Sequence, residues 1–119
     1  MHRRNLRKQG EAGEELAARF LERRGFKILD RNYRFERGEI DIVAEEDGDL
    51  VFIEVKARHS VTYGAPEEAV TEEKQEQIRT VAEGYLYEHG IDGRLCRFDV
   101  VAIEFQNGAA NIRHIREAF

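Results

Sequence analysis

The sequence predicts one α/β domain in which helices flank both faces of a central mixed β-sheet. Its 119 residues are enough for a single hydrophobic core and too few for two. Apolar residues recur at helical spacing in two segments and at strand spacing in five. These segments follow the order helix, three strands, helix, two strands, which is typical of a layered α/β fold.

The first helix is expected over residues 11–24, because apolar side chains recur along one side and Gly25 follows as a stop signal. Glu14 lies on or beside this apolar stripe, since Ala17 and Leu21 follow it at helical spacings. A carboxylate near the core needs a partner. A helix-dipole contact, an arginine and a functional site are all open for Glu14.

Residues 27–35, 39–45 and 50–57 are expected to form three strands. Asp47-Gly48 separates the second strand from the third and predicts a two-residue type I′ hairpin turn, which needs positive φ at both positions. Counting outward from this turn places Val43 opposite Phe52. The hairpin register is therefore fixed by the turn.

The same register places Asp41 opposite Glu54, and Glu39 opposite Lys56. Two carboxylates about 5 Å apart repel each other by roughly 3 kcal/mol at an effective dielectric of about 20. A divalent cation reverses the sign of this interaction, and hard oxygen ligands suit Mg²⁺ or Mn²⁺. Lys56 projects from the same face as Glu54, where an ammonium group can orient water or neutralise a phosphate. The alternative is that these charges form the solvated face of a half-exposed strand.

The remaining elements are a loop over residues 58–66, a helix over 67–88 with a break near Thr71, and a hairpin of residues 95–105 and 111–115. An Asn-Gly pair marks the turn of that hairpin. The sequence contains no internal repeat, linker or low-complexity segment.

Asp99, Cys96 and the four histidines are expected to have no catalytic role. Asp99 is expected to pair with an arginine, and Cys96 to be a small buried hydrophobe. The histidines have no metal-ligand spacing and are expected at the surface; they are His2, His59, His89 and His114.

Charge is distributed unevenly along the chain, whose net charge is −5. Residues 1–10 contain no acid and are expected to form a basic N-terminal arm ahead of a single domain over residues 11–119. Such an arm can contact phosphates or remain a solvated terminus. The basic side chains of the arm are Arg3, Arg4, Arg7 and Lys8.

Composition and missing motifs narrow the function. A single cysteine rules out an internal disulfide, and there is no apolar run of membrane length, so a cytoplasmic protein is expected, with no membrane as partner. There is no glycine-rich phosphate loop, and Ser60 has no flanking elbow glycines. A lysine beside two carboxylates fits phosphate chemistry better than glycoside hydrolysis.

Residues along nearly the whole chain resemble the YraN family of small bacterial proteins. That family is similar in turn to the PD-(D/E)xK nucleases, with archaeal-type Holliday junction resolvases as the nearest well-understood relatives. The resemblance rests on Gly13-Glu14, Gly25-Phe26, Arg31-Asn32, Gly38-Glu39-Ile40-Asp41, Phe52-Ile53-Glu54-Val55-Lys56-Ala57-Arg58, Tyr63-Gly64, Lys74 and Arg97-Phe98-Asp99-Val100-Val101. The eleven-residue spacing from Glu14 to Gly25 matches the resolvases, whereas Ile40 stands where the superfamily name has proline.

The resemblance implies a restriction-endonuclease-like three-layer fold that holds Mg²⁺ or Mn²⁺. It implies that Asp41 and Glu54 bind the metal together with the backbone carbonyl of Val55. It also implies that Glu14 completes the acidic cluster, directly or through water, and that Lys56 positions the attacking water.

Three further residues match family positions, and we expect them to contact phosphates: Arg58, Tyr63 and Lys74. With the basic arm they form the expected nucleic-acid interface. The resolvase resemblance also implies a homodimer, by analogy alone.

The sequence therefore leads to the hypothesis of a divalent-metal-dependent nuclease that hydrolyses phosphodiester bonds, with DNA flaps, branches or junctions as expected substrates. One alternative is a non-catalytic nucleic-acid-binding module of the same fold that acts with a partner protein. Another is a protein-interaction adaptor with no affinity for DNA.

Overall fold

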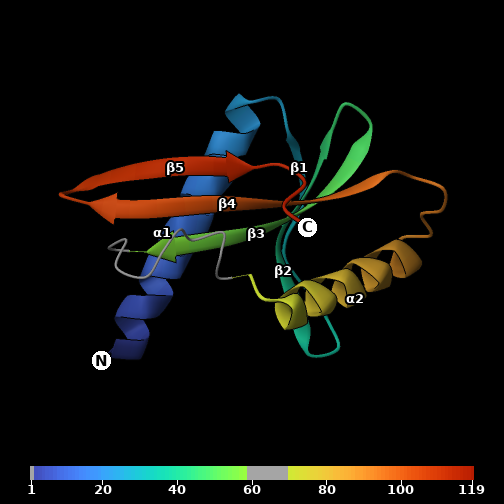
Figure 1. Ribbon diagram of the computed structural model, residues 1–119, viewed down its shortest axis with the longest axis horizontal. Helices are drawn as coiled ribbons and strands as arrows, with labels where there is room; N and C mark the ends of the chain where they lie inside the picture. Colours follow the sequence, from blue (N-terminus) through green and yellow to red (C-terminus); the bar gives the residue numbers. More distant parts are fainter. Residues whose placement is uncertain (1, 59–69) are drawn as a thin grey trace.

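The computed structural model describes residues 2–58 and 70–119, with side chains from residue 11 onward (Figure 1). The expected order of helices and strands is confirmed. The elements are α1 (His2–Arg23), β1 (Lys27–Phe35), β2 (Gly38–Glu46), β3 (Asp49–Arg58), α2 (Glu72–Glu88), β4 (Cys96–Gln106) and β5 (Ala109–Ile115).

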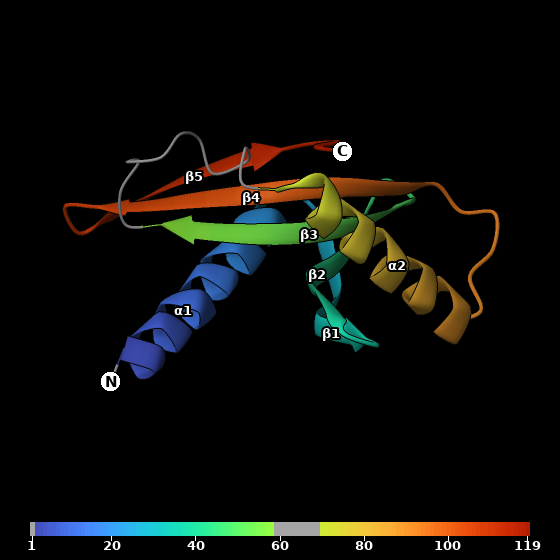
Figure 2. The same ribbon diagram turned by 60° about the horizontal axis from the view of Figure 1, so that its bottom comes forward.

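The strands form one mixed sheet in the order β1-β2-β3-β4-β5. Neighbouring strands are antiparallel except β3 and β4, which run parallel and are connected through α2. The sheet is strongly twisted, and α1 and α2 lie on opposite sides of its β1–β2 part (Figure 2). One core packs α1 against the sheet around Leu21 and Ile53, and the other packs α2 against it around Phe52 and Ile78. This is the restriction-endonuclease-like α/β arrangement that the sequence predicted.

Both predicted turns adopt the expected backbone conformation. Asp47 and Gly48 have φ values of 48° and 88°, and φ is also positive at both residues of the Asn-Gly pair between β4 and β5. The β2–β3 ladder pairs Val43 with Phe52, as the turn predicted. The Asp-Gly dipeptide is therefore enough to set the hairpin register.

Two helix boundaries differ from the prediction. Helix α1 begins at His2 rather than at residue 11, so the basic residues 2–10 belong to the helix backbone. Helix α2 begins at Glu72, because the Thr71 hydroxyl caps it by accepting the Lys74 N–H at 3.2 Å. The expected break near Thr71 is thus the start of α2. Residues 59–69, with most of the expected loop, lie outside the described residues.

The prediction for Cys96 is wrong, because this cysteine is exposed. It is the first residue of β4, and Leu95 before it is 76% exposed. The position at the rim of the sheet, rather than the apolar character of the local sequence, determines its exposure.

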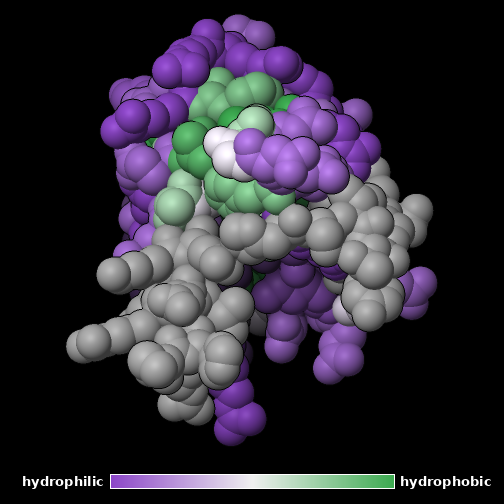
Figure 3. Space-filling model, turned by 90° about the vertical axis from the view of Figure 1, so that its left-hand side faces the viewer, coloured by the Kyte–Doolittle hydropathy of each residue, from purple (hydrophilic) through white to green (hydrophobic). Residues whose placement is uncertain are grey.

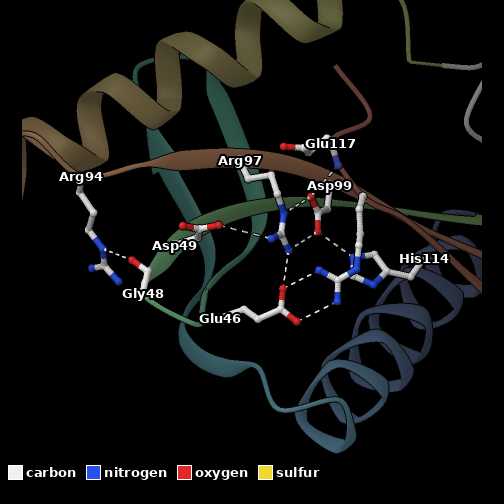
Figure 4. Close-up of polar contacts among 9 residues, drawn as sticks. Glu46, Gly48, Asp49, Arg94, Arg97, Asp99, His114 and Glu117 are labelled. Carbon is white, nitrogen blue, oxygen red and sulfur yellow. Dashed lines mark hydrogen bonds and ion pairs between the residues drawn. The ribbon is translucent and has the colours of Figure 1, made fainter.

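A partly buried ionic cluster ties the β2–β3 turn to β4 and to the end of β5 (Figure 4). Asp99 is fully buried and accepts hydrogen bonds from Arg97 Nε at 2.9 Å and from His114 Nε2 at 2.7 Å. Glu46 accepts from Arg97 Nη2 at 2.9 Å and from Arg116 Nη2 at 2.8 Å. The expected pairing of Asp99 with an arginine is confirmed. We call these five residues the ionic cluster.

The prediction of a surface position is wrong for His114, whose side chain is only 2% exposed. The rings of Phe20 and Phe26 meet it edge-on, with centroids 6.4 and 5.4 Å away. Pairing with Asp99 satisfies one ring nitrogen, which allows the imidazole to lie in the α1 core. His89 is exposed as expected, and His2 and His59 cannot be assessed because their side chains are outside the described set.

The described helices include none that is long and apolar enough to span a membrane. Seen from the end where β4 turns into β5, the surface shows a limited apolar area framed by hydrophilic residues (Figure 3).

Candidate metal and catalytic centre

The β2 and β3 strands part at the position of the predicted carboxylate pair. Their ladder ends at Ile42 and Ile53, and Asp41 Oδ2 instead accepts the backbone N–H of Val55 at 2.8 Å. The side chains of Asp41 and Glu54 share a hydrogen bond, so the two predicted carboxylates do meet. The expected pairing of Glu39 with Lys56 lies beyond the end of the ladder.

Helix α1 brings Glu14 to the same place. A Cβ atom on Gly13 would lie only 3.0 Å from the Cβ atom of Ala57, so the glycine allows α1 to approach β3 closely. Burial and then the charge of Asp41 raise the pKa of Glu14, whereas a hydrogen bond from the Asn32 side chain lowers it. Of the alternatives left open by the sequence, the functional-site reading gains support, because the charge with the largest effect on the pKa of Glu14 is that of another acid, Asp41.

Burial and mutual repulsion oppose ionisation of the carboxylate pair. Burial, followed by the charge of Glu54, raises the pKa of Asp41 to about 7, although the Val55 N–H acts in the opposite direction. The pKa of Glu54 is also raised, chiefly by burial. The pair therefore binds a proton that two exposed carboxylates would have released at neutral pH.

Two lysines from different elements act on Glu54. The charges of Lys74 on α2 and of Lys56 on β3 both lower the pKa of Glu54, and Lys74 has the larger effect. Lys74 thus lies near enough for its charge to act on Glu54, although the sequence suggested only a phosphate contact for it. No sequence signal linked Lys74 to Glu54, because the proximity arises from the packing of α2.

The structure describes the other predicted interface residues only in part. Arg58 ends β3, two residues beyond Lys56. Tyr63 lies outside the described residues. The four basic residues of the expected arm lie on the first half of α1, where only the backbone is described; they are Arg3, Arg4, Arg7 and Lys8.

The donor set fits a hard divalent cation that keeps most of its water shell. In the described part of the chain, no three acidic, histidine or cysteine side chains already enclose a metal position. Mg²⁺ commonly takes only one or two carboxylates, with water completing its shell. Asp41 and Glu54 offer two carboxylates, and the charge of Asp41 acts on Glu14, a third acid. The Val55 carbonyl would add the third oxygen that the resemblance implies.

A separate cleft of about 280 Å³ lies between α2 and the turn from β1 to β2. Its charged lining includes Glu36, Glu73 and Glu76 against Arg37 alone. This acidic lining would repel phosphates, so the cleft does not extend the candidate centre.

The raised pKa of Asp41 predicts an unusual pH dependence of stability. In metal-free protein the folded state keeps a proton on Asp41 up to a pKa of about 7, whereas the unfolded chain loses it near 3.8. Folding therefore binds a proton between these pH values, so the contribution of Asp41 to the free energy of unfolding falls as pH rises from about 4 to about 7. Subtracting the profile of Asp41→Asn isolates this contribution in urea titrations with chelator present. A flat difference profile would contradict it.

Comparison with known proteins agrees with the extent of the resemblance. The model of the uncharacterised protein family UPF0102 matches residues 13–103. A UPF0102 protein of Moorella thermoacetica is 46% identical over 95% of this chain and 96% of its own length. One from Symbiobacterium thermophilum is 47% identical over 95% and 97%, and one from Chlorobaculum parvum is 50% identical over 91% and 82%.

Proposed function

The chain belongs to the uncharacterised protein family UPF0102, the YraN family, and we propose that it is a divalent-metal-dependent nuclease that hydrolyses phosphodiester bonds in DNA. One observation carries the proposal. Asp41 and Glu54 form a largely buried, hydrogen-bonded carboxylate pair whose pKa values remain raised although the charges of two lysines act on Glu54. A carboxylate pair without a function destabilises the fold, whereas selection for metal binding would retain such a pair despite the lost stability.

Each residue has a distinct role in this proposal. Asp41 and Glu54 hold Mg²⁺ or Mn²⁺ with the Val55 carbonyl, and the Val55 N–H fixes the orientation of Asp41 through its 2.8 Å hydrogen bond. The bound cation would activate water and stabilise charge that develops on the phosphate. Lys56 orients the attacking water.

Lys74 is assigned to the substrate side of the centre. It projects from the first turn of α2 and acts on Glu54 from the helix layer, opposite the layer that carries Glu14. An ammonium group there can contact a phosphate oxygen next to the scissile bond. The basic beginning of α1 extends the phosphate-binding surface, and the resolvase resemblance favours flaps, branches or junctions as substrates.

The proposal is tested by incubating purified protein with flap, junction and single-stranded DNA in Mg²⁺ or Mn²⁺. Cleavage is expected in metal and not in chelator. Lys56→Ala is expected to lower the cleavage rate by about 10²- to 10⁴-fold, the usual contribution of a positioned proton-transfer group, while leaving Mn²⁺ affinity nearly unchanged. Lys27→Ala, at an exposed position on β1, is the matched control and should cleave as wild type does.

The outcomes separate the alternatives. Equal cleavage by wild type and Lys56→Ala would identify a contaminating nuclease. Salt-dependent DNA binding without cleavage would favour the non-catalytic nucleic-acid-binding module. No affinity for DNA in any form would favour a protein-interaction adaptor.

A further inference from the structure

Two adjacent residues of β1 bind two adjacent residues of α1. Arg31 Nη1 donates to Glu15 Oε2 at 2.8 Å, and the side chain of the next residue, Asn32, lowers the pKa of Glu14 as a hydrogen-bond partner of its carboxylate. Glu15 is exposed and also binds Arg19, so the first contact is a surface ion pair. The charge of Asp41 raises the pKa of Glu14, so the second contact belongs to the candidate metal centre.

Adjacent side chains of a regular strand point to opposite faces of the sheet, so two such contacts with one helix need an explanation. Asn32 has a φ of 55°, in the left-handed region. Arg31 pairs with Ile42 on the α1 side of the sheet, whereas Tyr33 packs against Tyr85 of α2 with centroids 5.0 Å apart. Residues two apart normally share a face, so β1 reverses its faces at Asn32.

The facing strand reverses at the same level. Ile40 of β2 lies in the α2 core and Ile42 lies in the α1 core. The β1–β2 pairs Tyr33–Ile40 and Arg31–Ile42 place Asn32 opposite Asp41, the residue between these two isoleucines. The backbone irregularity in both strands is therefore centred on the candidate metal centre.

Asparagine suits this position in two ways. After glycine it is among the residues that best tolerate a left-handed backbone. Its short side chain ends in an amide whose N–H groups can donate to a carboxylate. Glycine would meet the first requirement and fail the second, which separates the backbone role from the hydrogen-bonding role.

We infer that Asn32 is a positioning residue that holds the Glu14 carboxylate toward Asp41 and thereby completes the acidic wall of the metal centre. The inference deepens the proposed function and rests on it. Residues that orient a metal ligand through a hydrogen bond typically change metal affinity about 10- to 100-fold when they are replaced. Because Glu14 is the residue that Asn32 orients, the two should act as one unit.

The test measures Mn²⁺ dissociation constants from the electron paramagnetic resonance signal of the free ion at pH 8. Asn32→Gly and Glu14→Gln are each expected to weaken Mn²⁺ binding by about tenfold. The double variant should be no weaker than either single variant, because the second change removes nothing more. Arg19→Ala, which breaks a surface ion pair with Glu15 on α1, is the matched control and should bind Mn²⁺ as wild type does.

The possible failures are distinguishable. Wild-type protein that does not bind Mn²⁺ would overturn the proposed metal centre and this inference with it. Wild-type affinity in Asn32→Gly, with weakened binding in Glu14→Gln, would overturn the inference alone. Additive losses in the double variant would also overturn it. Melting temperatures of all variants, measured without metal, exclude partial unfolding as the cause of weak binding.

Discussion

Asp41→Asn is expected to lower the rate of metal-dependent cleavage by about 10³-fold. The variant loses several kcal/mol of charge stabilisation by the metal in the transition state, and each 1.36 kcal/mol corresponds to a tenfold change in rate. The same substitution should increase the stability of metal-free protein at pH 8. Asparagine keeps the size of the side chain and an oxygen that can accept the Val55 N–H, while the repulsion of Glu54 is removed. Cleavage rates and urea midpoints test the two halves of this prediction.

The opposite signs of these effects make the result informative. A residue needed only for the fold would lose stability when replaced, whereas a functional residue held in an unfavourable site gains it. Glu45→Gln is the matched control on the same strand, since the ion pair of Glu45 with Arg94 does not involve the carboxylate pair. It should leave cleavage unchanged. Asp41→Asn with wild-type cleavage would refute the role assigned to Asp41.

Asp99→Asn is expected to destabilise the protein by about 3–5 kcal/mol, the usual cost of breaking a buried ion pair from one side. Asp99 is fully buried and accepts from Arg97, His114 and the Glu117 N–H. An amide cannot satisfy all these donors, and the Arg97 charge loses its buried partner. A small domain has only about 5–15 kcal/mol of total stability, so the loss should be plain in urea unfolding.

The pH dependence of this contribution follows from the lowered pKa of Asp99, to which the hydrogen bonds from His114 and Arg97 contribute against the effect of burial. The stabilisation is present above the unfolded pKa and is lost as pH falls through the folded pKa. Glu15→Gln is the control, because the exposed Glu15 also pairs with two arginines and should be replaceable at little cost. Equal unfolding midpoints for the two variants would contradict the role of the ionic cluster.

The hairpin that carries Asp41 and Glu54 could be predicted because its information is local. Asp47-Gly48 requires positive φ at both residues, and a two-residue turn leaves one register that keeps Val43 and Phe52 together. Helical phase likewise predicted that Glu14 faces inward. These features depend on residues close together in the chain.

Other features of the centre depend on contacts between distant segments. The effect of Lys74 on Glu54 follows from how α2 packs, and the contact of Asn32 with Glu14 follows from a reversal of faces within β1. The end of the β2–β3 ladder at Ile42 was not predicted either, because a turn sets the register but not the length of pairing.

The burial of His114 was not predicted either, because it also depends on contacts between distant segments. Metal-ligand spacing is a local test, and His114 has no such spacing. Its partner Asp99 lies on the neighbouring strand, and Phe20 lies on a helix from the other end of the chain. Composition predicted a basic arm over residues 1–10, whereas α1 begins at His2 and continues through most of that segment.

The central claim is that Asp41 and Glu54 together hold a divalent cation, and a crystal structure with Mn²⁺ at pH 8 tests it most directly. Above the pKa of about 7 for Asp41, the pair is ionised and available to the metal. The prediction is one anomalous peak coordinated by both carboxylates, which disappears in Asp41→Asn crystals. Well-ordered Asp41 and Glu54 with no anomalous peak between them, at saturating Mn²⁺, would contradict the claim.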